Sequence, residues 1–200
     1  MKVSFRYLTV VAFAFMFVLP LVATAGGKTS TVNKSIRIDE NSTTGNVDSV
    51  NGSIRIGANS VVKSVDSVNG SINLASDVSV ERGIEAVNGS VTLEPGCDVG
   101  GNVETVNGSI RLQSTSVSGD IETVNGGIRL LNGTEVVGNV VVRKPGGWNN
   151  KRSKPVKVEI GENVQVHGDL IFEQEVELKL HDSASVGEII GDEVTIVGKS

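Results

Sequence analysis

The sequence predicts an all-β chain of 200 residues that folds as a single-domain parallel β-solenoid, a right-handed β-helix of about eight coils of 18–19 residues. Three observations predict it. A Val-Asn-Gly-Ser-Ile phrase returns at a nearly constant step, and apolar–polar–apolar alternation follows each copy. Glycine is abundant at 24 residues and aromatic residues make up only 4%, a composition that suits short strands and tight turns rather than helices.

The repeated phrase sets the length of a coil. Its copies begin 18 or 19 residues apart, at Val32, Val50, Val68, Val87, Val106 and Val124. The fourth and sixth residues after each of these valines are apolar in every copy, as Ile54 and Ile56 are in the second one. Because each repeat is too short to bury its own apolar side chains, we expect successive coils to stack and bury them in one continuous column.

A corner of each coil is expected at the Asn-Gly pair. At Asn51-Gly52, glycine would supply a positive φ, and Val50 and Ile54 would both point inward around the turn. Asn-Gly between alternating residues is also a strong hairpin signal, so a meander of hairpins is the alternative. A meander would put the leading valines on the same face as charged residues, which favours the solenoid. A left-handed winding is a further alternative, because apolar residues also recur in sixes from Val50 to Val80.

The asparagines of the phrase are predicted to form an inward ladder at this corner, with one amide above another at about 4.8 Å. Each amide would donate to the next and satisfy backbone groups. The ladder comprises Asn33, Asn51, Asn69, Asn88, Asn107 and Asn125. Most of them lie in Asn-x-Ser/Thr sequons, and glycans would disrupt the ladder, so we expect a bacterial source, where such sequons are usually silent.

Residues 1–25 differ from the rest and are predicted to be a signal peptide. Lys2 and Arg6 precede an apolar run, and the segment ends in Ala23-Thr24-Ala25, which is typical of a cleavage site. A membrane anchor is the alternative, but the run is short for a spanning helix. We therefore expect export to the periplasm or cell surface of a bacterium. Residues 26–200 would then form one solenoid domain, with no stable membrane span after cleavage.

The repeat loosens after Leu130. Residues 143–155 contain two prolines and lack alternation, so they are predicted to be a surface loop inserted into one coil. Alternation resumes at Val156 and predicts two or so further coils. The loop holds Trp148 among basic residues. There the indole could stack on a sugar or contact anionic lipid, or it could fold back over the coil.

Two columns of charge accompany the repeat. The acidic column is expected to face outward and comprises Asp48, Asp66, Glu85, Glu104 and Glu122. The basic column comprises Arg37, Arg55, Arg111 and Arg129. We interpret both as solvated faces that discourage sideways pairing of sheets. The alternative is that the acidic column, together with Trp148, binds cations or a charged glycan.

No set of residues predicts catalysis, a metal site or a cofactor, and the chain is expected not to be an enzyme. His167 and His181 lack metal-ligand spacing with each other or with Cys97. Cys97 has no internal disulfide partner and is expected to be a buried filler or, alternatively, a dimer-forming thiol. The net charge of −5 becomes −7 without Lys2 and Arg6, which argues against nucleic acid as a partner. The expected partners are the chain itself, stacked end to end, or envelope glycans.

The repeats between residues 32 and 142 resemble a family of exported bacterial proteins described as adhesins, whose function is unknown. That resemblance implies a parallel β-solenoid and carries over no functional residue. Residues 156–197, with Gly161-Glu162-Asn163-Val164 and Val166-His167-Gly168-Asp169-Leu170, are similar to the bactofilins, right-handed β-helices that polymerise by stacking end to end. We therefore expect a non-enzymatic structural or adhesin-like protein of the cell envelope. A carbohydrate- or cation-binding module and a polysaccharide-active enzyme are the alternatives.

Overall fold

The structure is a computed structural model that describes residues 27–146 and 154–197. The predicted signal peptide and Trp148 lie outside these residues. The described chain contains 24 short strands and no helix. Its strands pair in parallel in all three sheets, which confirms the predicted parallel β-solenoid and excludes a meander of antiparallel hairpins.

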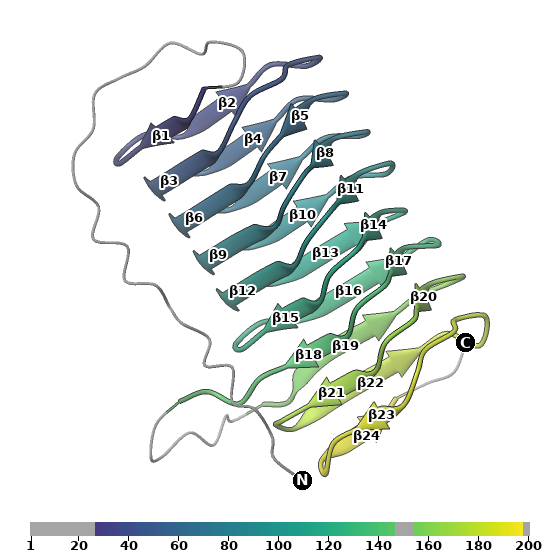
Figure 1. Ribbon diagram of the computed structural model, residues 1–200. Helices are drawn as coiled ribbons and strands as arrows, with labels where there is room; N and C mark the ends of the chain where they lie inside the picture. The colour runs from purple at the N-terminus through teal and green to yellow at the C-terminus, as the bar shows by residue number, and fades with distance from the viewer. Residues whose placement is uncertain (1–26, 147–153, 198–200) are drawn as a thin grey trace, which may run out of the picture.

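Three sheets, here named A, B and C, run along the molecule (Figure 1). Sheet A consists of β1 (Thr29–Thr31), β3 (Val47–Asn51), β6 (Val65–Asn69), β9 (Ile84–Asn88), β12 (Val103–Asn107), β15 (Ile121–Thr123), β18 (Val140–Val142), β21 (Leu170–Phe172) and β23 (Ile189–Ile190). Sheet B consists of β2 (Ile36–Ile38), β4 (Ile54–Ile56), β7 (Ile72–Leu74), β10 (Val91–Leu93), β13 (Ile110–Gln113), β16 (Ile128–Leu131), β19 (Val156–Ile160), β22 (Val176–Leu180) and β24 (Val194–Ile196). Sheet C consists of β5 (Val61–Val62), β8 (Ser79–Val80), β11 (Asp98–Val99), β14 (Ser116–Val117), β17 (Glu135–Val136) and β20 (Gln165–Val166).

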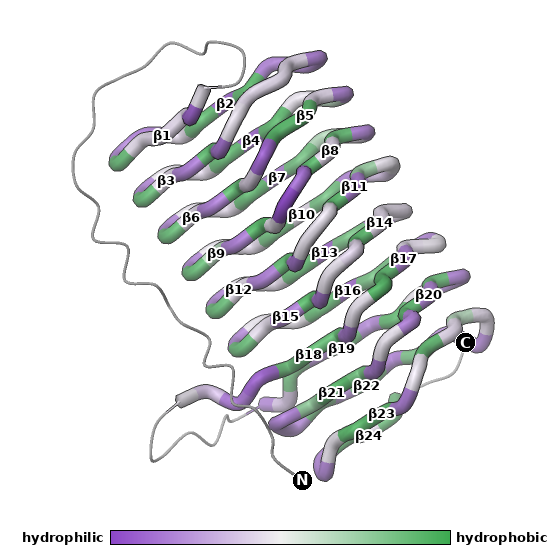
Figure 2. The backbone as a smooth tube through the Cα atoms, in the orientation of Figure 1, coloured by the Kyte–Doolittle hydropathy of each residue, from purple (hydrophilic) through white to green (hydrophobic). Residues whose placement is uncertain are grey.

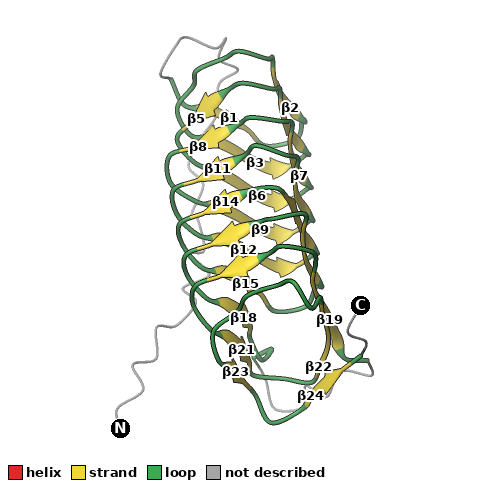
Figure 3. Ribbon diagram, turned by 90° about the vertical axis from the view of Figure 1, so that its right-hand side faces the viewer, coloured by secondary structure: helices red, strands yellow, loops and turns green. Residues whose placement is uncertain are grey.

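Each coil passes from sheet A through sheet B to sheet C before it returns to sheet A, and the winding is right-handed (Figures 1 and 3). Sheets A and B each hold nine strands, which corresponds to about eight turns. Val47 pairs with Val65, an offset equal to the repeat step. The step lengthens where Ile128 pairs with Val158, because residues 143–155 fall between β18 and β19.

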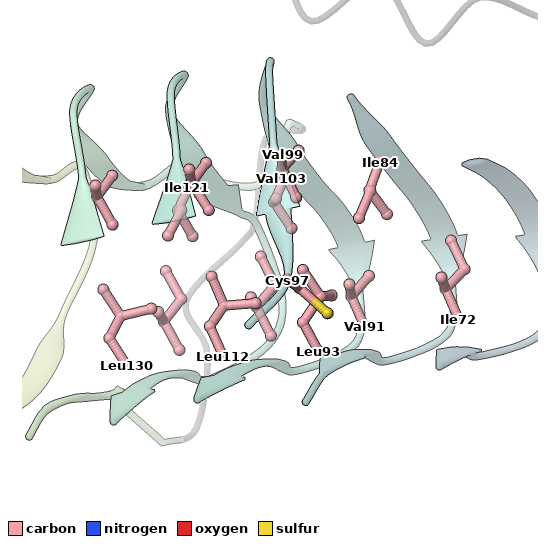
Figure 4. Packing of buried hydrophobic residues seen from close by; sticks show 14 of the residues in the cluster. Ile72, Ile84, Val91, Leu93, Cys97, Val99, Val103, Leu112, Ile121 and Leu130 are labelled. Carbon is pink, nitrogen blue, oxygen red and sulfur yellow. The ribbon is translucent and has the colours of Figure 1, made fainter. Parts of the chain in front are cut away.

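The core is a single column of apolar side chains that the three sheets enclose. In most strands of sheet B the side chains of the first and third residues point inward, so Ile54, Leu74, Leu93 and Leu112 are almost fully buried. Figure 4 shows side chains from opposite sheets, such as Ile121 and Leu130, pointing toward one another across the interior. Hydrophobic segments recur at corresponding places in successive coils (Figure 2). Stacking therefore buries the apolar side chains that a single coil would leave exposed.

The prediction that Val50 points inward is wrong. The strand runs straight through Val47–Asn51, and side chains alternate along a strand. Val47 and Ser49 are buried, so Val50 lies on the outer face beside Asp48 and is half-buried there. The same shift applies to Val68, Val87 and Val106. Small residues take the inner position instead, in the row Ser49, Ser67, Ala86, Thr105 and Thr123.

The corner glycines are needed for close approach and not for a positive φ, which corrects the second expectation about this corner. Among them only Gly70 has a positive φ, and at 159° this is extended backbone. A Cβ at Gly108 would instead overlap the carbonyl group of Gly89 in the preceding coil. The left-handed conformation occurs at the turn between sheets B and C, at Asn41, Asn59, Asp77, Gly96, Ser114, Asn132 and Asn163. Asparagine, aspartate and glycine adopt that conformation most readily.

Candidate functional site

The asparagine ladder forms at the corner between sheets A and B. Each Nδ2 donates a hydrogen bond to the Oδ1 of the asparagine one coil earlier, at 2.8–3.1 Å. The ladder runs through Asn33, Asn51, Asn69, Asn88, Asn107 and Asn125. The expected inward orientation is wrong, because these asparagines lie at the corner and the first five are exposed to solvent. The ladder is thus a neutral surface row that links six coils.

The acidic column lies on the outer face of sheet A, and we call it the acidic row. Parallel pairing places its members side by side in the order Asp48, Asp66, Glu85, Glu104 and Glu122. The row was expected to be solvated, but its two end residues are buried, Asp48 at 7% exposure and Glu122 at 8%. Only the middle of the row, where Glu85 is exposed, matches the expected solvated face.

Each buried end of the acidic row contacts a cation from outside the row. Asp48 Oδ2 lies 2.7 Å from Lys28 Nζ and accepts a hydrogen bond from Ser30 Oγ at 3.1 Å. Glu122 Oε2 lies 3.0 Å from the guanidinium of Arg143. These contacts compensate the two least solvated carboxylates, which would otherwise be costly to bury.

The surroundings of Asp66 in the acidic row disfavour its ionised form. The pKa of Asp66 is raised from 3.8 to about 7, chiefly by burial and then by the hydrogen bond to Asp48 and the negative charges of Asp48 and Glu85. A hydrogen bond from Ser64 Oγ at 3.3 Å acts in the opposite direction. At neutral pH a substantial fraction of Asp66 is therefore protonated, which relieves repulsion along the row.

Arg143 joins the acidic row to the last coils. Its guanidinium contacts Glu122 at 3.0 Å and Glu173 at 2.9 Å, and these bonds raise the pKa of Arg143 above its ordinary value. Gln174 Nε2 donates to the carbonyl oxygens of Val124 at 2.7 Å and Arg143 at 2.6 Å. The row then continues with Val141, so Arg143 marks the point where its chemistry changes from acidic to apolar.

We expect Arg143→Ala to destabilise the protein by about 2–3 kcal/mol, because it leaves the carboxylate of Glu122 buried without a cation. Arg129→Ala is the matched control. Arg129 contacts Glu159 at 2.8 Å on an exposed part of sheet B, so its loss should cost at most about 1 kcal/mol. Urea unfolding followed by circular dichroism measures both. In the double variant Glu122→Gln, Arg143→Ala part of the loss should be recovered, and an unchanged deficit would contradict this explanation.

A cavity of about 510 Å³ lies at the same corner beyond the asparagine ladder, and we call it the corner cavity. Its charged lining residues are Lys144, Lys154, Glu173, Glu175, Asp192 and Glu193. In the last coils this corner has no Asn-Gly pair: Glu173-Gln174-Glu175 follows Phe172, and Gly191-Asp192-Glu193 follows Ile190. The sequence signal for this cavity was the absence of Asn-Gly from these coils, where acidic residues follow Phe172 and Ile190.

Two further features refine the sequence analysis. The basic column lies on the outer face of sheet B, and Arg129 there contacts Glu159, which also contacts Lys179.

The sequence reasoning missed a second row of polar side chains. The side-chain oxygens of Asn102, Asp120, Asn139 and Asp169 accept hydrogen bonds from backbone N–H groups one coil later, at 2.7–3.0 Å. Its signal was an Asn or Asp directly before the sheet A strand in successive coils.

Cys97 is buried at 2% exposure, and its Sγ lies 3.1 Å from the carbonyl oxygen of Ala75. Burial raises the pKa of the Cys97 thiol. This placement fits the buried filler and not the dimer-forming thiol. Within residues 27–146 and 154–197, no three His, Cys, Asp or Glu side chains are grouped so that they could hold a metal ion. The same residues include no helix that is long and apolar enough to span a membrane.

Fold and surface together define a parallel β-solenoid repeat protein whose outer faces carry rows of like side chains. Comparison with protein families, with characterised proteins and with solved structures gave no match. The resemblances to the adhesin family and to the bactofilins therefore stay predictions.

Proposed function

We propose that the chain is a non-enzymatic, exported structural element of the bacterial cell envelope, adhesin-like in its repeated surface, whose copies associate end to end. One observation carries this proposal. Sheets A and B extend to the terminal coils, and within the described residues their outermost strands, β1 and β2 at one end and β23 and β24 at the other, pair on one side only. Such edges are templates for pairing with another chain.

Repeat proteins need terminal caps with a polar outer face to stay apart from one another. At the C-terminal end Ile196 and Val197 are exposed. Within the described residues no helix covers either end. A second copy would bury these side chains and complete the hydrogen bonding of the edge strands, so association has both an apolar and a backbone component.

Export and an adhesive surface rest on different features of the sequence. A basic start, an apolar run and Ala23-Thr24-Ala25 favour export with cleavage after Ala25. The rows on sheets A and B present the same groups once per coil, and a stack of copies would extend that presentation. Repeated weak contacts with a polymeric envelope surface would then add up through multivalency.

Sedimentation velocity of the protein purified after export tests the proposal. We expect the weight-average sedimentation coefficient to rise with concentration, and electron microscopy to show rods of constant width and increasing length. Mass spectrometry of the same material should show a chain that begins at Gly26. A strictly monomeric protein at high concentration would overturn self-association, and retention of residues 1–25 would overturn cleavage.

A carbohydrate- or cation-binding module is the second candidate, and the corner cavity with its carboxylates and two lysines is the observation that favours it. Isothermal titration with calcium ions and with envelope polysaccharides distinguishes the candidates. Saturable heat that Glu175→Gln abolishes would favour binding at the cavity. No heat with either probe would remove this candidate and leave the structural one.

A further inference from the structure

The two ends of the solenoid differ in how well they close the core. One inward row of sheet B can be followed from the first coil to the last. Its first residue, Ile36, is 6% exposed, Leu178 in the next-to-last coil is fully buried, and the last residue, Ile196, is 51% exposed. Ile189 and Val186 are also only partly buried against the core. The C-terminal end is therefore open and the N-terminal end nearly closed.

The ends also differ in charge. Residues 27–46, which form the first coil, hold three basic and two acidic side chains, a net charge of +1. Residues 181–197, at the other end, hold four acidic side chains and no Lys or Arg, a net charge of −4. Opposite charges attract when unlike ends meet, whereas two C-terminal ends would bring like charges together.

The direction of the strands also favours contact between unlike ends of two copies. Every sheet is parallel, so a coil added after β23 and β24 continues the solenoid only if its strands run the same way. The first coil of a second copy supplies such strands, β1 for sheet A and β2 for sheet B. Two C-terminal ends could meet only through antiparallel strands, which would break the register of the rows.

The register of the known pairs then identifies residues that would meet. Leu178 pairs with Ile196 in the last coils, and Ile36 holds the equivalent position in the first coil. A continued stack places Ile36 of the second copy on the exposed Ile196. Lys34 stands two residues before Ile36, as Val194 stands two before Ile196, so Lys34 would lie at the corner where Asp192 and Glu193 are found.

We propose that copies of this chain assemble head to tail, the first coil of one copy docking on the C-terminal coil of the next, with Lys34 facing Asp192 and Glu193. This rests on the self-association proposed above and adds its polarity. The contact is heterologous, so it generates open filaments and not closed dimers.

Charge reversal at each end, measured by sedimentation velocity on the exported protein, tests the polarity. Lys34→Glu alone, and Asp192→Lys with Glu193→Lys, should each raise the concentration needed for association about tenfold or more, because like charges then face each other. An equimolar mixture of the two variants should associate again, because each reversed end finds a complementary one. Lys63→Glu and Glu94→Lys, at exposed positions away from the ends, are the matched controls and should associate like the wild type.

The possible outcomes separate this inference from the proposed function. If the wild type never associates, both fail. If the wild type associates and Lys34→Glu associates equally well, the first coil is not part of the contact and only the head-to-tail polarity is overturned. If both end variants lose association and the mixture restores it while the controls behave as wild type, the polarity is supported.

Discussion

Gly108→Ala is expected to destabilise the protein by about 3 kcal/mol or more, one of the largest effects available to a single methyl group here. Gly108 lies at the corner between β12 and β13, in the middle of the stack. Its added Cβ would overlap the carbonyl oxygen and carbon of Gly89 in the preceding coil. Both obstacles are backbone atoms, so no side chain can move aside, and the coils themselves must separate.

Separation at this corner should also reduce cooperativity. A solenoid is held by contacts between neighbouring coils, so a weakened interface in the middle allows the two halves to unfold separately. In urea, monitored by circular dichroism, we expect a lower midpoint and a smaller m-value for Gly108→Ala than for the wild type.

Gly146→Ala is the matched control, because a Cβ there meets no heavy atom within 4 Å. Its stability should stay within about 0.5 kcal/mol of the wild type. Equal stability of the two variants would mean that the coils do not approach each other at the Asn-Gly corner as closely as the structure places them.

The close stacking that this prediction depends on was predictable from the sequence. The repeat step of 18 or 19 residues gives the strand register directly, as the pairs Val47 with Val65 and Val65 with Ile84 show. The same arithmetic predicts that like residues stand in rows, the acidic row among them. A short repeat leaves few ways to bury its apolar residues, so the repeat period alone was enough to predict the architecture.

Side-chain direction near the corner could not be predicted from the phrase alone. Asn-Gly locates a corner, but the strand continues to Asn51, so alternation from Val47 places Val50 outside and Ser49 inside. A row of small polar residues was the available signal. Two of them show why the interior accepts hydroxyls: Ser67 Oγ donates to the carbonyl of Gly70 at 3.0 Å, and Thr105 Oγ1 to that of Gly89 at 3.1 Å.

The electrostatics of the candidate site depend on residues that no repeat specifies. Lys28 reaches Asp48 from the first coil, and Arg143 reaches Glu122 from the start of the inserted loop. Neither cation belongs to a charged column of the repeat, so the sequence predicted that the whole acidic row would be solvated. The corner cavity is likewise a consequence of lost repetition, since it lies in the coils that lack the Asn-Gly pair.

Asp66→Asn is expected to stabilise the protein at pH 8 and to leave its stability at pH 4 unchanged. The pKa of Asp66 is about 7 in the folded protein and 3.8 for an unperturbed aspartate. Because the folded value is raised, the contribution of Asp66 to stability is fully present below about pH 4. It is lost as the pH rises through 7, where the folded protein must ionise a half-buried carboxyl beside Asp48 and Glu85.

The shift would correspond to about 4 kcal/mol for a fully shielded carboxyl, and allowance for the solvent that reaches Asp66 reduces the expected gain to about 2 kcal/mol. Asparagine retains an oxygen that can accept the hydrogen bond from Ser64 and removes the charge. Urea unfolding at pH 4, 6 and 8 measures the difference. Asp98→Asn, on an exposed position of sheet C between Ser79 and Ser116, is the control and should show no such pH dependence.

A lower stability of Asp66→Asn than of the wild type at pH 8 would point to a cation in the acidic row. If Asp66→Asn lowers stability at pH 8, the ionised carboxyl is stabilising, and the acidic row must then hold a positive charge that the protein itself does not supply. Repeating the pH 8 measurement with added calcium ions resolves this, because a bound cation stabilises only the state that binds it. Calcium that stabilises the wild type and not Asp66→Asn would favour the cation-binding candidate. The same small effect on both would mean that the acidic row binds no calcium and that protonation of Asp66 relieves the repulsion between neighbouring coils.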